Sequence, residues 1–207
     1  SNNTSVGYQS LYSVTTGNLN SAFGKDAGDS VTSGEKNVFI GAESGQNTTS
    51  QSNCTFVGYE AGYNAQASNT TALGYQALTG LTSGARNLAI GYQSGRLIGT
   101  QNDNTFIGFQ SGRSTTGSSN VALGKYTMYE GAGANNCTAI GTNALKDVTS
   151  SDNVAIGYNA MLEHANGTSN TVVGASAMDD SNGHAGYHNS FFGTKSGAGG
   201  WTGAAHS

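Results

Sequence analysis

The stretch Asn153-Val154-Ala155-Ile156-Gly157-Tyr158-Asn159-Ala160 decides the fold, because close variants of it fill almost the whole chain. Its central glycine recurs twelve times, at intervals of 16 to 19 residues. A short and regular period predicts one structural unit stacked on copies of itself, so that each copy buries its apolar residues against its neighbours. The central glycines are Gly7, Gly24, Gly41, Gly58, Gly74, Gly91, Gly108, Gly124, Gly141, Gly157, Gly174 and Gly193.

The unbroken repeat favours a single elongated body in the 207 residues. We assign residues 1–198 to a repeat domain and residues 199–207 to a C-terminal tail. The chain has 32 glycines and no proline. Proline would delete a backbone donor that a neighbouring layer needs, whereas glycine permits positive φ at a tight corner. This composition is typical of a stacked, all-β solenoid.

Charge and hydropathy exclude two classes of partner. Only 10% of the residues are charged and the net charge is −4, so the chain has no basic face for nucleic acid. No apolar run approaches the ~20 residues of a membrane-spanning helix, which argues against membrane insertion. We therefore expect neither nucleic acid nor a bilayer as partner.

Position in the repeat is counted from the central glycine, and residues at one position in successive coils form a column. Positions −3 to −1 have strand-forming residues and predict a short strand, with the glycine as a corner and a second short strand after it. Position −1 is apolar in all twelve coils, and position +3 is Ala, Ser or Thr. We expect the −1 and +3 columns to face each other in a thin core.

Two further columns vary together. Phe at −2 always accompanies Gly at +4, as in Phe106 with Gly112, whereas Leu or Met at +4 accompanies a smaller residue at −2. We infer that −2 and +4 fill one shared volume from opposite sides. Ala22 with Gly28 and Ala89 with Gly95 break this exchange, and we expect less-filled layers there.

Asparagine stands at −4 in nine coils and at −5 in the other three. Because Asn tolerates left-handed backbone, it suits a second corner at −4, and stacked Asn residues can form an amide ladder. Cys54 and Cys137 occupy −4 in two coils. Five layers at ~4.8 Å would separate them by about 24 Å, so we expect two unpaired thiols. A disulfide between symmetry mates stays open.

The sequence Asn153 to Ala160 resembles the head repeats of YadA-type trimeric autotransporter adhesins, whose units read like Asn-Val-Ala-Ile-Gly-x-x-Ala. The segments 87–91 and 120–124 are similar, and the resemblance covers all twelve coils. It implies a left-handed parallel β-roll of about twelve 16–17-residue coils in each chain, with three rolls side by side in a homotrimer. The adhesin heads repeat in about fourteen residues, and the longer coil here looks like repeats of phage tail fibres and related surface fibres.

Fibres of that kind often carry a chaperone that cuts itself off after a serine, and Ser207 fits the residue left by such a cut. An arbitrary chain boundary fits Ser207 equally well. The resemblance implies an extracellular location, on a virion or a cell surface.

Catalytic and metal-binding patterns are weak. The acids form no column and no recurring pair of the kind that glycoside hydrolysis needs, and no Ser/His/Asp combination is supported. His184 and His188 lie in the long 19-residue interval, where symmetry could bring copies together as metal ligands. Ordinary loop histidines are the alternative, and we assign no metal, no cofactor and no enzymatic activity.

The +1 column is the candidate for receptor binding. It is aromatic in four consecutive coils, and rings ~4.8 Å apart on a flat sheet would form a platform for sugars. A structural ladder, or packing where chains meet, is the alternative reading. The four residues are Tyr59, Tyr75, Tyr92 and Phe109.

Three function classes follow. We expect a structural or adhesive fibre segment that projects from a virion or cell and binds a surface glycan or a protein receptor. A monomeric ice-binding solenoid is compatible with the low charge, but a Thr-x-Thr rank in every coil is missing. A carbohydrate-active enzyme built on the solenoid is opposed by the scattered acids.

Overall fold

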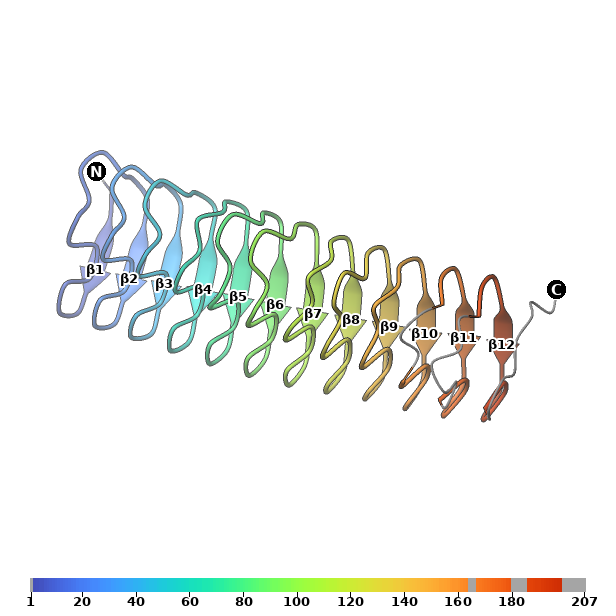
Figure 1. The fold of residues 1–207 in the computed structure, drawn as a ribbon. Helices are drawn as coiled ribbons and strands as arrows, with labels where there is room; N and C mark the ends of the chain where they lie inside the picture. Colours follow the sequence, from blue (N-terminus) through green and yellow to red (C-terminus); the bar gives the residue numbers. More distant parts are fainter. Residues whose placement is uncertain (1, 164–166, 180–185, 199–207) are drawn as a thin grey trace. The chain divides into compact units, whose positions relative to one another are not determined.

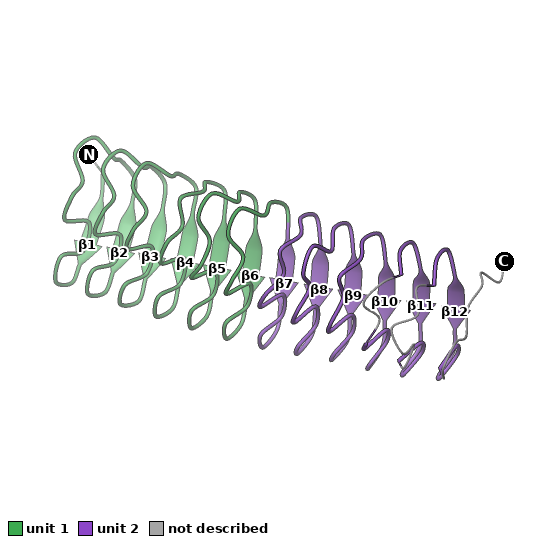
Figure 2. Ribbon diagram, in the orientation of Figure 1, with its two compact units in different colours: residues 1–103 green, residues 104–207 purple. Residues whose placement is uncertain are grey.

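The computed structural model describes residues 2–163, 167–179 and 186–198. The chain divides into two compact units, residues 1–103 and 104–207, which Figure 2 distinguishes by colour. Each unit is a β-solenoid that contributes one three-residue strand per coil, and the units are described separately (Figure 1). The prediction of an all-β solenoid of parallel strands is confirmed.

The first unit contains six strands that pair in parallel, each with the next one along the chain. The pairing is in register with the sequence repeat, so that Thr71, Ala72 and Leu73 lie beside Leu88, Ala89 and Ile90. The strands are β1 Thr4–Val6, β2 Ser21–Phe23, β3 Val38–Ile40, β4 Thr55–Val57, β5 Thr71–Leu73 and β6 Leu88–Ile90.

The second unit repeats this arrangement with six further strands, again parallel and each paired with the next. The interval of 19 residues before the last strand leaves the register unchanged, because Val172 still pairs with Phe191. The strands are β7 Thr105–Ile107, β8 Val121–Leu123, β9 Thr138–Ile140, β10 Val154–Ile156, β11 Thr171–Val173 and β12 Ser190–Phe192.

The −2 column, not the −1 column, forms the core, so the sequence prediction for −1 is wrong. Ala72 at −2 is fully buried, whereas Leu73 at −1 is 44% exposed. Neighbouring residues of a strand face opposite sides, and the −2 side is the inner one. The +3 column is buried as expected, but it lies against −2: the Ser44 hydroxyl donates to the Phe56 carbonyl at 2.8 Å.

The segment after the central glycine is a series of turns, and the expected second strand is absent from the described coils. Two positions in this segment have left-handed backbone in all twelve coils. At +2 the residue is never glycine, as with Gln76 at φ 52°, and at +4 it is glycine, Leu or Met, as with Leu78 at φ 53°. These two left-handed residues turn the chain back so that +3 and +4 reach the inner side of the strand.

The central glycines form the corner at positive φ, between 120° and 149°. A Cβ on Gly157 would lie 2.4 Å from the carbonyl oxygen of Gly174 in the next coil. Both the backbone conformation and this close approach therefore require glycine.

The inferred exchange of volume between −2 and +4 is confirmed by contact. A Cβ on Gly45 would lie 2.4 Å from Phe39 Cε1, and in the coil where Ala72 stands at −2, Leu78 at +4 is fully buried. The layer at Ala22 is nevertheless filled, contrary to our expectation. A Cβ on Gly28 would lie 2.6 Å from Phe39 Cδ2, because that ring extends from the following coil.

The −4 asparagines form a buried ladder in which side chains bond to backbone. The Asn37 N–H donates to Asn20 Oδ1 at 3.0 Å, and Asn20 Nδ2 donates to the Gly34 carbonyl at 2.8 Å. The left-handed residue is at −5, as with Lys36 at φ 59°, so the prediction of an Asn corner at −4 is wrong. Only where Asn stands at −5, as with Asn53 at φ 60°, does it occupy that corner.

Candidate functional site

The outer face of the strands carries an exposed apolar column, which we call the −1 stripe. Its side chains point away from the core because the strand alternates, and stacking in register places one in every coil. In the first unit the stripe consists of Val6, Phe23, Ile40, Val57, Leu73 and Ile90. In the second unit it consists of Ile107, Leu123, Ile140, Ile156, Val173 and Phe192.

Three of the four predicted receptor-binding aromatics stack on one another in the first unit. The ring centroids of Tyr59 and Tyr75 lie 5.4 Å apart with an interplanar angle of 20°, and those of Tyr75 and Tyr92 lie 5.2 Å apart at 6°. At these distances the rings lie face against face, since coplanar neighbours would need a wider separation. The flat platform that we expected is therefore wrong, and the arrangement is a ladder whose ring edges face outward.

A polar ladder runs beside the tyrosines at +2. Gln76 Nε2 donates to Glu60 Oε2 at 2.7 Å, and Gln93 Nε2 donates to Gln76 Oε1 at 2.8 Å. A hydrogen bond to the Glu60 carboxylate, with its negative charge and that of Glu43, raises the pKa of Tyr59 to about 12. The Tyr59 hydroxyl at this edge is thus a neutral donor near neutral pH.

The fourth predicted aromatic, Phe109, lies in the second unit among cations and other rings. Its centroid is 5.5 Å from that of Tyr126 in an edge-to-face contact, and Tyr126 makes a similar contact with Tyr129 at 5.4 Å. Lys125 Nζ lies 5.0 Å from the Tyr126 centroid and 5.8 Å from that of Phe109. Arg113 Cζ lies 5.4 Å from the Tyr129 centroid. We call these five residues the basic-aromatic cluster.

Sequence reasoning missed this cluster because it considered only the +1 column. The signal was present in the coil at 124–129, which is the only one with an aromatic residue at +2. Tyr126 takes the left-handed +2 position at φ 55° without disturbing the fold. The surface residue at +2 is therefore unusual in this coil. Its core residues follow the repeat, and Met128 at +4 is fully buried.

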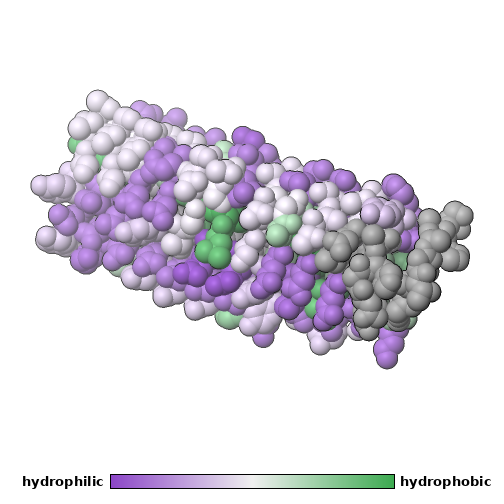
Figure 3. All heavy atoms as spheres, viewed as in Figure 1, coloured by the Kyte–Doolittle hydropathy of each residue, from purple (hydrophilic) through white to green (hydrophobic). Residues whose placement is uncertain are grey.

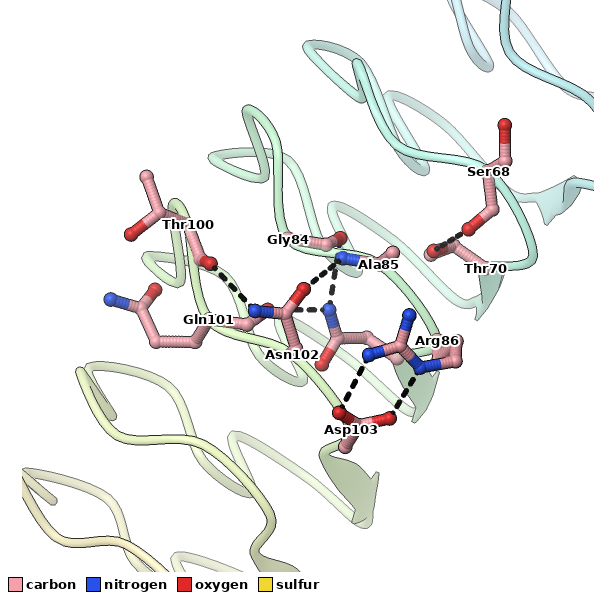
Figure 4. A network of polar contacts seen from close by, with 10 residues as sticks. Ser68, Thr70, Gly84, Ala85, Arg86, Thr100, Gln101, Asn102 and Asp103 are labelled. Atoms are coloured by element: carbon pink, nitrogen blue, oxygen red, sulfur yellow. Dashed lines mark hydrogen bonds and ion pairs between the residues drawn. The ribbon is translucent and has the colours of Figure 1, made fainter.

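Three cations outside the cluster, Lys25, Arg86 and Lys146, are paired with neighbouring acids. Arg86 makes a two-pronged ion pair with Asp103 of the next coil, with Nε to Oδ1 at 2.6 Å (Figure 4). The adjacent Asn102 Oδ1 accepts from the Ala85 N–H at 2.8 Å in the same network. The guanidinium holds the pKa of the Asp103 carboxyl below its usual value. This ion pair links two successive coils. Because the guanidinium charge is balanced by the carboxylate, Arg86 is a poor site for an anionic ligand.

The two thiols are buried and free, as expected. Cys54 Sγ donates to the Ala67 carbonyl at 3.3 Å, which is the role that Asn Nδ2 has in other coils. Burial raises the pKa of Cys54 to about 11 and raises that of Cys137 as well. Both residues replace an amide of the ladder and are poor nucleophiles.

Metal and processing candidates find no support among the described residues. His188 is exposed at the −5 corner with φ 57°, while His184 and Ser207 lie outside the described ranges. No group of three or more His, Cys, Asp or Glu side chains in those ranges is arranged to hold a metal ion. Within the same ranges, no helix is long and apolar enough to span a bilayer.

The face of the molecule seen in Figure 3 carries mostly polar side chains, with apolar residues in small separate patches.

Comparison of the chain with protein-family models, with curated proteins and with solved structures finds no match. The candidate surfaces are the −1 stripe, the tyrosine ladder formed by Tyr59, Tyr75 and Tyr92, and the basic-aromatic cluster.

Proposed function

We propose that this chain is a segment of an extracellular fibre on a virion or cell, a homotrimer of left-handed rolls that attaches to a surface glycan or protein receptor. The observation that carries the proposal is the −1 stripe. An apolar residue stands at this position in all twelve coils, although the position lies on the outer face. A solvated strand face would carry polar residues there.

The free energy gained by burying the −1 stripe favours association of the chains. Phe23 and Ile40 are both 42% exposed, and finishing the burial of such a side chain is worth roughly 1 kcal/mol. Over the stripe this amounts to on the order of 10 kcal/mol per chain, which rivals the whole stability of an ordinary domain. Exposed apolar surfaces mark interaction sites, and a neighbouring copy with the same repeat spacing would match the stripe of each unit coil for coil.

Attachment is supported by what the solenoid leaves exposed. The tyrosine ladder and the basic-aromatic cluster present aromatic edges and polar groups, which are the groups that bind sugars and protein loops. No acid pair with catalytic spacing was apparent in the sequence, so binding is proposed in preference to hydrolysis.

The mass of the chain in solution, measured by light scattering, tests the trimer. The expected value is three times 20.9 kDa. Replacing Ile40 and Ile156 together by Asp should yield monomers, because it places charges in the buried seam. Ser119→Asp, at an exposed left-handed corner, is the matched control and should leave the trimer intact. A wild-type monomer would overturn the fibre proposal and make ice recrystallisation the next assay.

Receptor attachment needs a separate readout. The labelled trimer is applied to an array of bacterial and animal glycans and to immobilised cell-surface proteins. Saturable binding to one class supports attachment. A trimer that binds neither class would reduce the proposal to a structural spacer.

A further inference from the structure

We propose that the basic-aromatic cluster (Phe109, Arg113, Lys125, Tyr126 and Tyr129) binds an anionic saccharide, through its carboxylate or sulfate groups. The inference deepens the proposed function and rests on it, because it names the chemical class of the receptor. It is carried by the two cations of this cluster, which lie over aromatic rings and make no salt bridge with any described residue.

Lys125 and Lys25 occupy the same +1 column, but only one of them is neutralised. Lys25 Nζ lies 2.6 Å from Asp26 Oδ2, and Asp26 is the +2 residue of its coil. In the coil of Lys125 the +2 residue is Tyr126, and Nζ lies over aromatic rings. The exposed Lys125 makes no salt bridge with any described residue.

Arg113 shows the same pattern. It makes no salt bridge within the described ranges, and its Nε is buried there without a hydrogen-bond partner. Its guanidinium instead lies over the Tyr129 ring, which orients it without satisfying its donors. By comparison, Nε and Nη2 of Arg86 both donate to the Asp103 carboxylate. The Nε is too buried to meet a ligand, so a planar anion would contact the terminal amino groups of the Arg113 guanidinium.

The rings hold the two cations in place and add apolar surface. Phe109, Tyr126 and Tyr129 contact one another edge to face, so that they present ring edges and faces in several orientations. Pre-oriented cations lose less side-chain entropy when a ligand binds. Aromatic surface beside cationic donors suits a pyranose ring, whose C–H faces are apolar and whose substituents are charged.

The other anionic partners fit less well. Nucleic acid needs a broad basic face, and this chain has a net charge of −4 with only eight Lys and Arg residues. An acidic peptide would use the same two cations but would leave the ring surface without a matching apolar face. A saccharide uses both parts of the cluster.

The test measures binding of the full chain to four probes by biolayer interferometry. Hexameric oligogalacturonate presents carboxylates, dextran sulfate presents sulfates, unmodified dextran is the neutral match, and poly-L-glutamate is the peptide. At least one of the two anionic saccharides should bind, and unmodified dextran at least tenfold more weakly. The better of the two identifies the preferred anionic group.

Variants locate the site. Lys125→Ala and Arg113→Ala should each weaken binding of the preferred saccharide at least tenfold, whereas Lys25→Ala should change it less than twofold. Arg113→Lys should restore part of the affinity. Circular dichroism and the melting temperature, measured for every variant, separate lost binding from lost folding.

Several results would overturn the inference: no binding of either anionic saccharide, equal binding of dextran, tighter binding of poly-L-glutamate, or equal losses from Lys25→Ala and Lys125→Ala. The solution mass distinguishes this failure from failure of the fibre proposal. A trimer without saccharide binding refutes the cluster alone, and a monomer that binds through Arg113 and Lys125 refutes the fibre alone.

Discussion

Phe106 and Gly112 share one volume in the core of the second unit: a Cβ placed on Gly112 would lie 2.4 Å from Cδ1 of the Phe106 ring. In the coil of Leu145 the same volume is filled from the other side, with Ala139 at −2. The core volume of each coil therefore stays nearly constant. In some coils the large side chain comes from the strand at −2, and in others it comes from the turn at +4.

Phe106→Ala should lower the free energy of unfolding by roughly 3–5 kcal/mol, because it leaves a cavity under a fully buried position. Adding Gly112→Leu should recover part of this loss, since Leu145 already adopts left-handed backbone at the equivalent site with φ 49°. Denaturant unfolding of both variants measures the recovery. Gly112→Leu alone is the control and should destabilise by overpacking. A double variant no more stable than Phe106→Ala would contradict the shared volume.

Gly157→Val should destabilise its coil by about 3 kcal/mol or more, because it combines strained positive φ with a clash. The added Cβ would lie 2.4 Å from the Gly174 carbonyl oxygen. Gly99→Ala is the comparison, since a Cβ there meets nothing closer than 3.7 Å. Thermal melting should separate the two variants by many degrees, and similar melting temperatures would remove the argument for a glycine corner.

Asn120→Ala should lower the free energy of unfolding by roughly 2–4 kcal/mol, because it leaves two buried backbone groups without partners. The lost bonds are those from the Cys137 N–H to Asn120 Oδ1 and from Asn120 Nδ2 to the Ala134 carbonyl. Asn120→Cys should cost less, as Cys54 retains a bond to the equivalent carbonyl. Chemical denaturation ranks the variants, and the reverse order would argue against the ladder.

Cys54 and Cys137 should resist thiol reagents in the native protein at pH 8. Burial raises the pKa of Cys54 to about 11, so its thiolate is scarce at that pH, and burial also raises the pKa of Cys137. Reaction with a chromogenic disulfide should be slow in buffer and should reach two thiols per chain in denaturant. Rapid labelling of the folded protein would show that the −4 position is open to solvent.

The Tyr59 phenol should titrate with a pKa of about 12, because the Glu60 carboxylate accepts its hydrogen bond and repels its anion. Glu60→Gln should return this pKa toward the usual value of about 10. The sign follows from the raised pKa: the native contact is kept below pH 10 and lost as the pH rises through about 12. The difference in ultraviolet absorbance between wild type and variant, measured across this range, isolates Tyr59 from the other tyrosines.

Much of the solenoid was determined by the sequence alone. The spacing of the central glycines predicted the stacked coils, and residues such as Val154 to Ile156 predicted the strand that follows each Asn. The paired variation of Phe106 with Gly112 predicted a contact, because two side chains that fill one space must compensate in volume. These features are local or repeat in register, and a repeat exposes them in a single chain.

Which face of the strand is buried was decided only by tertiary structure. Alternation places −1 and −2 on opposite sides of the strand, but Ile156 and Ala155 are both apolar, so the pattern does not say which side is inside. The answer depends on the left-handed residues at +2 and +4, which fold the next segment over the −2 side. The basic-aromatic cluster likewise exists only because stacking brings Arg113 of one coil beside Tyr129 of the next.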